Sequence, residues 1–145
     1  MEAAYIAGIV DGEGTIGIKR QSNGKSYNGY ICVVNTCKEL LINLLDRYDR
    51  GSVSDCTSRL QMGNRVCWRW EVAGSHVVVV LKELLPFLFI KKEQAELVID
   101  YYEKLSRFRA SRNNPIPQWV LDERARYKVR IHQLNSPGST KLFTL

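Results

Sequence analysis

Residues 5 to 18, YIAGIVDGEGTIGI, join a hydrophobic helix pattern to a strand pattern and place two carboxylates at the junction. The spacing of the apolar residues predicts a helix over 2–11, which the following glycines are expected to end. Isoleucines then alternate with small or polar residues, which indicates a half-buried strand over 15–20. Asp11 and Glu13 therefore fall where a hydrophobic helix stops and a strand begins.

The rest of the chain continues this change between helix and strand periods. Turn residues, capping signals and alternation predict the next elements. A strand returns from an Asn23-Gly24 turn, a helix opens with a capping box at 36–39 and is closed by Gly51, and two strands follow at about 52–60 and 65–72 around Met62-Gly63-Asn64. A helix capped by Ser75 then ends before Pro86, and two more helices are predicted over 91–106 and 117–134.

This order, αββαββα followed by C-terminal helices, predicts an α+β fold with a four-stranded antiparallel sheet and helices on one face. A length of 145 residues suits a single domain, which we place at 1–134, with 135–145 expected to be a flexible tail. The sheet face without helices would then present polar, basic and aromatic side chains: Lys19, Gln21, Asn28, Tyr30, Arg65 and Arg69.

The net charge of +6 is unevenly distributed. Basic residues gather in 14–38 and in 50–70, and two positive patches on an otherwise neutral body indicate a surface that binds a polyanion. The basic stretch 104–130 fits phosphate contact and ordinary solvated surface equally well. No apolar run reaches the length of a membrane span, so a membrane partner is not expected.

Four cysteines form no CxxC pair, and the chain has only two histidines, so a zinc site is not expected. Unpaired thiols favour a reducing intracellular compartment. Whether that compartment is an organelle or a prokaryotic cytoplasm stays open.

Residues 6–14, IAGIVDGEG, resemble the nine-residue signature of the LAGLIDADG homing endonucleases. The likeness extends to Asn35 before a leucine-rich helix, to Gly51 before the third strand, and to the Pro-Phe-Leu, Lys and Gln-Ala residues of 86–95. The chain departs from the family pattern at Glu13, because the motif usually carries Asp there. The resemblance implies an endonuclease of the single-motif, homodimeric type.

The chemistry of such a site also follows from the residues themselves. Hydrolysis of a phosphodiester needs an in-line water, shielding of the developing charge and stabilisation of the leaving alkoxide, all of which hard divalent cations supply. These cations prefer carboxylate and carbonyl oxygens, so Glu13 and the Gly12 carbonyl are the expected ligands of Mg²⁺, with Ca²⁺ or Mn²⁺ as substitutes. Lys91 is a candidate for stabilising charge near the scissile phosphate. The resemblance implies that Asn35 helps to order solvent.

One chain supplies only one such acid, and the resemblance implies that two motif helices pair about a two-fold axis. We therefore expect a homodimer that binds double-stranded DNA at a long, roughly palindromic site. The expected dimer interface is the small-residue face of the first helix: Ala4, Ala7, Gly8 and Asp11. The expected DNA contacts are Lys19, Gln21, Lys25, Asn28, Tyr30, Arg59, Arg65 and Arg69.

Three functional classes remain open. The first is a metal-dependent, site-specific endonuclease encoded within an intron or intein. The second is a maturase on the same scaffold that binds its intron RNA, and the third is a non-catalytic DNA-binding regulator. Retention of Glu13, Gly12 and Lys91 favours the endonuclease.

Overall fold

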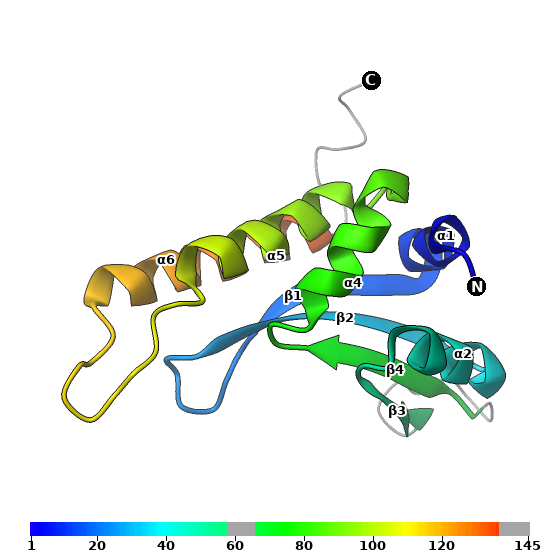
Figure 1. Ribbon diagram of the computed structural model, residues 1–145, viewed down its shortest axis with the longest axis horizontal. Helices are drawn as coiled ribbons and strands as arrows, with labels where there is room; N and C mark the ends of the chain where they lie inside the picture. The colour runs from blue at the N-terminus through cyan, green and yellow to red at the C-terminus, as the bar shows by residue number, and fades with distance from the viewer. Residues whose placement is uncertain (58–65, 137–145) are drawn as a thin grey trace.

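The structure is a computed structural model that describes residues 1–57 and 66–136 (Figure 1). Its elements follow the predicted αββαββα order and then add C-terminal helices, which confirms the α+β fold class. In chain order they are α1 (Ala3–Glu13), β1 (Gly14–Arg20), β2 (Tyr27–Asn35), α2 (Lys38–Tyr48), β3 (Ser52–Asp55), β4 (Trp68–Ala73), α4 (Val77–Leu84), the 3₁₀ turn η1 (Leu85–Phe87), α5 (Lys92–Leu105) and α6 (Gln118–Asn135).

The four strands form one antiparallel sheet in the order β1-β2-β4-β3. Alternation along the strands decides which residues enter the core, as the register Ile16↔Ile31↔Val72 places three buried apolar side chains in one row. Trp70, which is fully buried, extends this apolar face toward α2, where its ring stacks on Tyr48. The helices α4, α5 and α6 lie together on one side of the sheet, and none of the described helices covers the other side (Figure 1).

Helix α1 ends two residues later than the sequence predicts. It runs to Glu13, so Gly12 lies inside the helix and the strand begins directly at Gly14. A helical glycine costs about 1 kcal/mol, which the full burial of Ile6 and Val10 offsets. Glu13 therefore ends the helix instead of following it.

Two predicted helix caps are wrong. The N-cap of α2 is Cys37, which makes no side-chain cap bond, and not Thr36. Asn35 ends the preceding strand and its Oδ1 accepts the Cys37 N–H at 2.8 Å, so a local Asn turn replaces the capping box. The N-cap of α4 is His76, whereas Ser75 contributes only a backbone bond to that helix.

The second strand pair differs from its predicted bounds. Strand β3 ends at Asp55 and not near residue 60, and β4 begins at Trp68. The predicted turn at 62–64, Arg59 and Arg65 lie outside the described residues. At the other end of the chain, α6 ends at Asn135, and 137–145 also lie outside the described part. Among the described helices, none has the length and apolar character needed to cross a membrane.

Two glycines with positive φ allow a test of this sheet geometry. Gly51 has φ 89°, and a Cβ there would lie 2.3 Å from the Glu71 carbonyl oxygen; Gly74 has φ 80° and open space around it. Gly74→Ala should lower the free energy of unfolding by about 1–2 kcal/mol through backbone strain alone. Gly51→Ala should cost at least about 1 kcal/mol more, because β4 must also shift. Urea unfolding measures both values, and equal losses would contradict the close approach at Gly51.

Candidate functional site

Two expected catalytic residues meet at the C-terminal end of α1. Glu13 is the last residue of this helix and is exposed to solvent, and Asn35 is the last residue of β2. The Asn35 Nδ2 donates a hydrogen bond of 2.6 Å to Glu13 Oε2. The amide oxygen of Asn35 is already used by the Cys37 N–H, so the orientation that presents its nitrogen to Glu13 is fixed from both sides.

Asp11 ties the same helix end to the start of α5. Its carboxylate accepts hydrogen bonds from the backbone N–H groups of Phe89, Ile90 and Lys91 at 2.9, 3.1 and 3.0 Å. The Lys91 Nζ in turn donates to the Asp11 carbonyl oxygen at 2.7 Å. The Lys91 side chain is therefore held at Asp11, which precedes Glu13 by two residues on α1, although Lys91 and Glu13 are far apart in the sequence. Three segments, from α1, β2 and the start of α5, thus converge on one place.

The donor set at this place suits a hard cation. Glu13 offers a carboxylate whose Oε1 accepts no hydrogen bond from the described residues, and the adjacent Gly12 is exposed with its backbone at the negative end of the helix dipole. The described residues of one chain contain no group of three or more His, Cys, Asp or Glu side chains able to hold a metal ion. The predicted ligands Glu13 and Gly12 thus belong to no larger cluster of such side chains in the described part of the chain.

The exposed side of α1 is lined by small residues, but not all of those expected. Ala4, Gly8 and Gly12 are exposed at intervals of four residues, and a Cβ placed on either glycine would meet nothing within 4 Å. Ala7 is fully buried, so its assignment to an exposed interface is wrong. Ala7 instead belongs to the hydrophobic core together with Ile6. Packing within the protomer gives no reason for glycine at two exposed helix positions.

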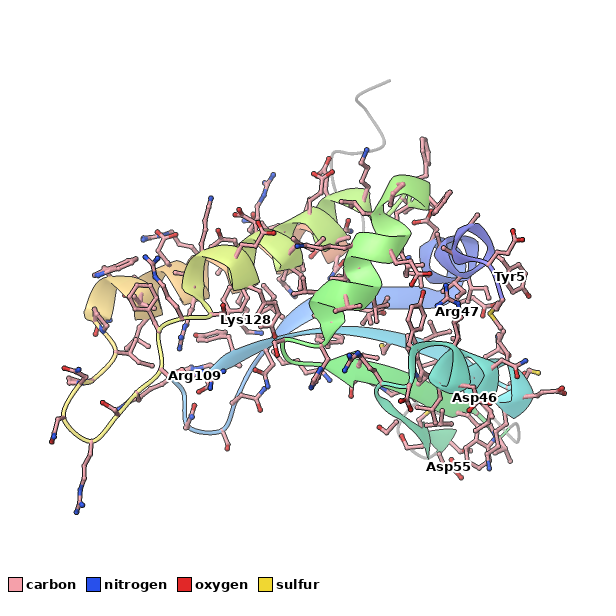
Figure 2. All side chains as sticks on the ribbon, in the orientation of Figure 1. Tyr5, Asp46, Arg47, Asp55, Arg109 and Lys128 are labelled. Carbon is pink, nitrogen blue, oxygen red and sulfur yellow. The ribbon has the colours of Figure 1, made fainter. Side chains whose placement is uncertain are left out.

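A partly apolar hollow in the protein surface runs along the same side of α1. Tyr5, which Figure 2 labels on α1, is 60% exposed. An open hollow of about 470 Å³ begins there and reaches the Glu13–Asn35 pair, and it is lined by Ala4, Tyr5, Gly8, Ile9, Gly12, Glu13, Asn35 and Leu40. The small-residue side of α1 is therefore continuous with the place where the predicted catalytic residues meet.

The expected DNA contacts fall into three groups. The strand register places one group on the sheet face that the helices leave uncovered: Lys19, Asn28, Tyr30 and Arg69. Gln21 and Lys25 belong to the turn between β1 and β2, and Arg59 and Arg65 lie outside the described residues. The uncovered face thus carries polar and basic side chains, as the alternation predicted.

Glu71 changes the charge of this face and was not among the expected site residues. Its Oε1 accepts hydrogen bonds from Lys19 Nζ and, at 2.9 Å, from Arg69 Nη2, and it forms an ion pair with each. Burial by itself would raise the pKa of Glu71, but the hydrogen bond from Lys19 and the charge of Arg69 outweigh it and lower the pKa. Glu71 lies on the same face of β4 as Arg69, and Trp70 between them lies on the other face. The alternation of these residues in the sequence could have identified Glu71 as a residue of the uncovered face.

Tyr30 lies beside this ionic group. Lys19 Nζ is 4.2 Å from the centroid of its ring, and the ring rests on Gly17, where a Cβ would come within 2.6 Å of the tyrosine oxygen. Burial raises the pKa of the Tyr30 hydroxyl, which therefore stays protonated and able to donate at neutral pH. Burial likewise raises the pKa of the Cys32 thiol, so this neighbour stays uncharged.

The β1–β2 hairpin is held by a residue that sequence reasoning left undecided within the basic stretch 104–130. Arg124 of α6 is buried, and its guanidinium donates to the Lys25 carbonyl at 2.8 Å and to the Phe108 carbonyl at 2.6 Å. Arg124 is therefore structural and neither a phosphate contact nor a solvated side chain. Arg109 lies on the loop between α5 and α6, beside the β1–β2 hairpin (Figure 2). Arg109 and residues of the hairpin line a common pocket.

Solved structures provide the comparison for this fold, because no protein-family model and no curated protein matches the sequence. The homing endonuclease I-CvuI, solved in complex with the I-CreI target, superposes with a TM-score of 0.74 at 23% identity and covers 92% of this chain and 82% of its own. The archaeal intron-encoded homing endonuclease I-Vdi141I, complexed with DNA, gives 0.71 at 15% identity and covers 94% and 85%.

A third comparison concerns a longer chain. The LAGLIDADG meganuclease I-AabMI, bound to uncleaved DNA, matches with a TM-score of 0.66 at 14% identity, over 88% of this chain but only 44% of its own. One copy of the present fold thus corresponds to less than half of that protein. Together the superpositions show that this chain has the fold of the LAGLIDADG homing endonucleases.

The Asp11 anchor gives a stability prediction. Asp11→Ala leaves three backbone N–H groups without their acceptor, and it should lower the free energy of unfolding by about 2–3 kcal/mol. Asp46→Ala on the exposed side of α2 (Figure 2) is the matched control and should change it by less than about 0.5 kcal/mol. Denaturant titration of both variants checks the difference. Similar, small effects would show that Asp11 does not anchor the start of α5.

Proposed function

We propose that this protein is a LAGLIDADG homing endonuclease, which cuts double-stranded DNA at a long, roughly palindromic site as a metal-dependent homodimer. The observation that carries the proposal is the convergence of Glu13, Asn35 and Lys91 at the C-terminal end of α1. A carboxylate, a fixed amide and an ammonium group come from three distant segments, beside a helix surface that a second copy can cover. The fold shared with DNA-bound endonucleases supports the same function.

The Glu13 carboxylate and the Gly12 carbonyl would hold Mg²⁺ in this proposal. Ca²⁺ or Mn²⁺ would occupy the same position, with Ca²⁺ supporting DNA binding but not cleavage. When bound, the cation supplies a nucleophilic water and shields the charge that develops on the phosphate. Asn35 holds the Glu13 carboxylate through Oε2, and Oε1, which accepts no hydrogen bond from the described residues, would be the ligand atom. Lys91 would supply a stabilising positive charge near the scissile phosphate, and the Asp11 carbonyl oxygen positions its ammonium group.

A second copy of the chain would complete the site. Pairing through Ala4, Gly8 and Gly12 would let two α1 backbones approach closely, because none of these three residues has a side chain larger than a methyl group. The two Glu13 residues at the ends of the paired helices would then lie near one another on the two-fold axis. This supports a dimer better than a monomer, since one chain alone offers a single exposed carboxylate at this end of α1.

The uncovered sheet face would lie in the major groove of each half-site. Lysine and arginine side chains there can pair with guanine, and asparagine and glutamine with adenine, each good pair contributing about 1–3 kcal/mol of discrimination. In this proposal Lys19, Asn28, Tyr30 and Arg69 contact bases from the strands, while Gln21 and Lys25 contact DNA from the hairpin. Arg59 and Arg65 remain proposed contacts on the basis of the sequence alone.

Replacing Glu13 tests the catalytic proposal. Glu13→Gln removes a cation ligand but none of the proposed DNA contacts, so cleavage in Mg²⁺ should fall at least about 100-fold while DNA affinity stays within about threefold. Single-turnover cleavage and equilibrium binding in Ca²⁺ measure the two effects on a duplex selected by binding to the wild type.

Glu2→Gln is the matched control, because Glu2 is exposed at the other end of the same helix. It should cut like the wild type. Unchanged cleavage by Glu13→Gln would remove Glu13 from the mechanism. Specific binding without cleavage by the wild type would instead favour a DNA-binding regulator, and tight binding to intron RNA alone would favour a maturase.

A substitution on α1 tests the dimer. Gly8→Leu adds a large side chain where the protomer has open space, so the fold should persist while the helix surfaces are forced apart. Sedimentation velocity should show loss of the dimer, and circular dichroism should show unchanged helix content. A Gly8→Leu protein that remained dimeric would place the interface elsewhere.

A further inference from the structure

Glu71 occupies the middle of the sheet face that no described helix covers. It lies on β4 and pairs with Cys32 of β2 on one side and with Ser52 of β3 on the other. Its carboxylate joins Lys19 from β1 to Arg69 from its own strand. The side chain of Glu71 is 27% exposed, that of Lys19 is 43% exposed and that of Arg69 is 26% exposed. A single acceptor atom, Oε1, thus sets the position of two cations that come from different parts of the chain.

The surroundings of this ionic group restrict its members further. Lys19 lies over the Tyr30 ring, and that ring is fixed in turn against the backbone at Gly17. The Arg69 Nε is buried without a hydrogen-bond partner in the described part of the chain. Arg69 is therefore held by the Glu71 carboxylate through one end of its guanidinium, at the cost of an unpaired buried donor.

Partly exposed ion pairs contribute little to stability, so their contribution to recognition has to be considered. A guanidinium that is already oriented loses less side-chain entropy when it pairs with guanine, and a carboxylate can itself accept from cytosine N4. A negative charge in the centre of a basic face also weakens its attraction to phosphates of any sequence.

We propose that Glu71 is a positioning residue for base recognition, which rests on the function proposed above. It holds Lys19 and Arg69 in the orientation that reads base edges, and it cancels one of their two charges. Affinity for phosphate is thereby reduced while selectivity for sequence is increased. The partner of this group is a short run of base pairs in the major groove, opposite the centre of the sheet of each chain.

The variant Glu71→Gln tests this role, because it keeps the size of the side chain and removes its charge. The probes are a duplex recovered from a randomised pool by binding to the wild-type protein in Ca²⁺, and a scrambled duplex of the same length and composition. We expect the preference for the selected duplex to fall at least tenfold, with the loss concentrated at a few neighbouring base pairs. Binding of the scrambled duplex should tighten, and its salt dependence should steepen by up to about one released counterion.

Glu96→Gln is the matched control. Glu96 is exposed on α5, which lies on the helix-covered side of the sheet, so this variant changes the net charge equally without touching the uncovered face. It should retain the wild-type preference. The thermal unfolding temperature of Glu71→Gln should also stay near that of the wild type, because a purely structural role would lower it and would not alter selected base pairs.

The possible results separate the two proposals. If Glu71→Gln keeps both the preference and the salt dependence of the wild type, the positioning role is wrong while the endonuclease proposal stands. A preference that falls equally at every base pair, together with reduced stability, also overturns the positioning role. If the wild type itself does not prefer any selected duplex, the proposed function fails, and the role of Glu71 fails with it.

Discussion

The other contacts of the candidate site depend on the three hydrogen bonds that the Asp11 carboxylate accepts from the backbone N–H groups of residues 89–91. These hydrogen bonds join the end of α1 to the residues just before α5, across most of the sequence. Because Lys91 is part of that connection, its ammonium group reaches the Asp11 carbonyl. Because Glu13 follows Asp11 within the same helix, the carboxylate that contacts Asn35 is fixed by the same anchor. A charged acceptor for several backbone donors is a strong local constraint.

Helix α1 then serves two sets of contacts that require different residues. Large side chains such as Ile6 and Val10 are buried against the sheet and place the helix. On the opposite side, Gly8 and Gly12 are exposed and need no small size inside the protomer. In the proposed dimer this second side carries the contact between copies, so the metal ligands of each copy lie at the end of its own interface helix. The uncovered face of the sheet carries the residues proposed here to recognise DNA.

Local patterns in the sequence were sufficient for the fold but not for the details of the site. Alternation over β1, β2 and β4 predicted the sheet and its uncovered face, and the β-branched run 77–80 is helical as predicted because Val77 and Val80 are buried. The capping box at Thr36 was wrong, because the N-cap of α2 is Cys37 and the Asn35 side chain forms a local turn with the Cys37 N–H.

The remaining differences depend on contacts between distant segments. Ala7 was assigned to the wrong side of α1 because one residue of helical rotation separates an exposed position from a buried one. The pairing of Lys19 with Glu71 spans 52 residues, and no local pattern specifies the strand register that creates it. The structural role of Arg124 likewise follows from where the hairpin meets α6.

Cleavage of a randomised duplex-DNA pool by the wild-type protein, followed by sequencing of the cut ends, tests the central claim most directly. A composite site formed by two copies of α1 predicts a long consensus with two-fold symmetry, cut in Mg²⁺ and left intact in Ca²⁺ or in chelator. A short or clearly asymmetric consensus, or cutting that does not depend on the divalent cation, would contradict a symmetric, metal-dependent site at the end of this helix.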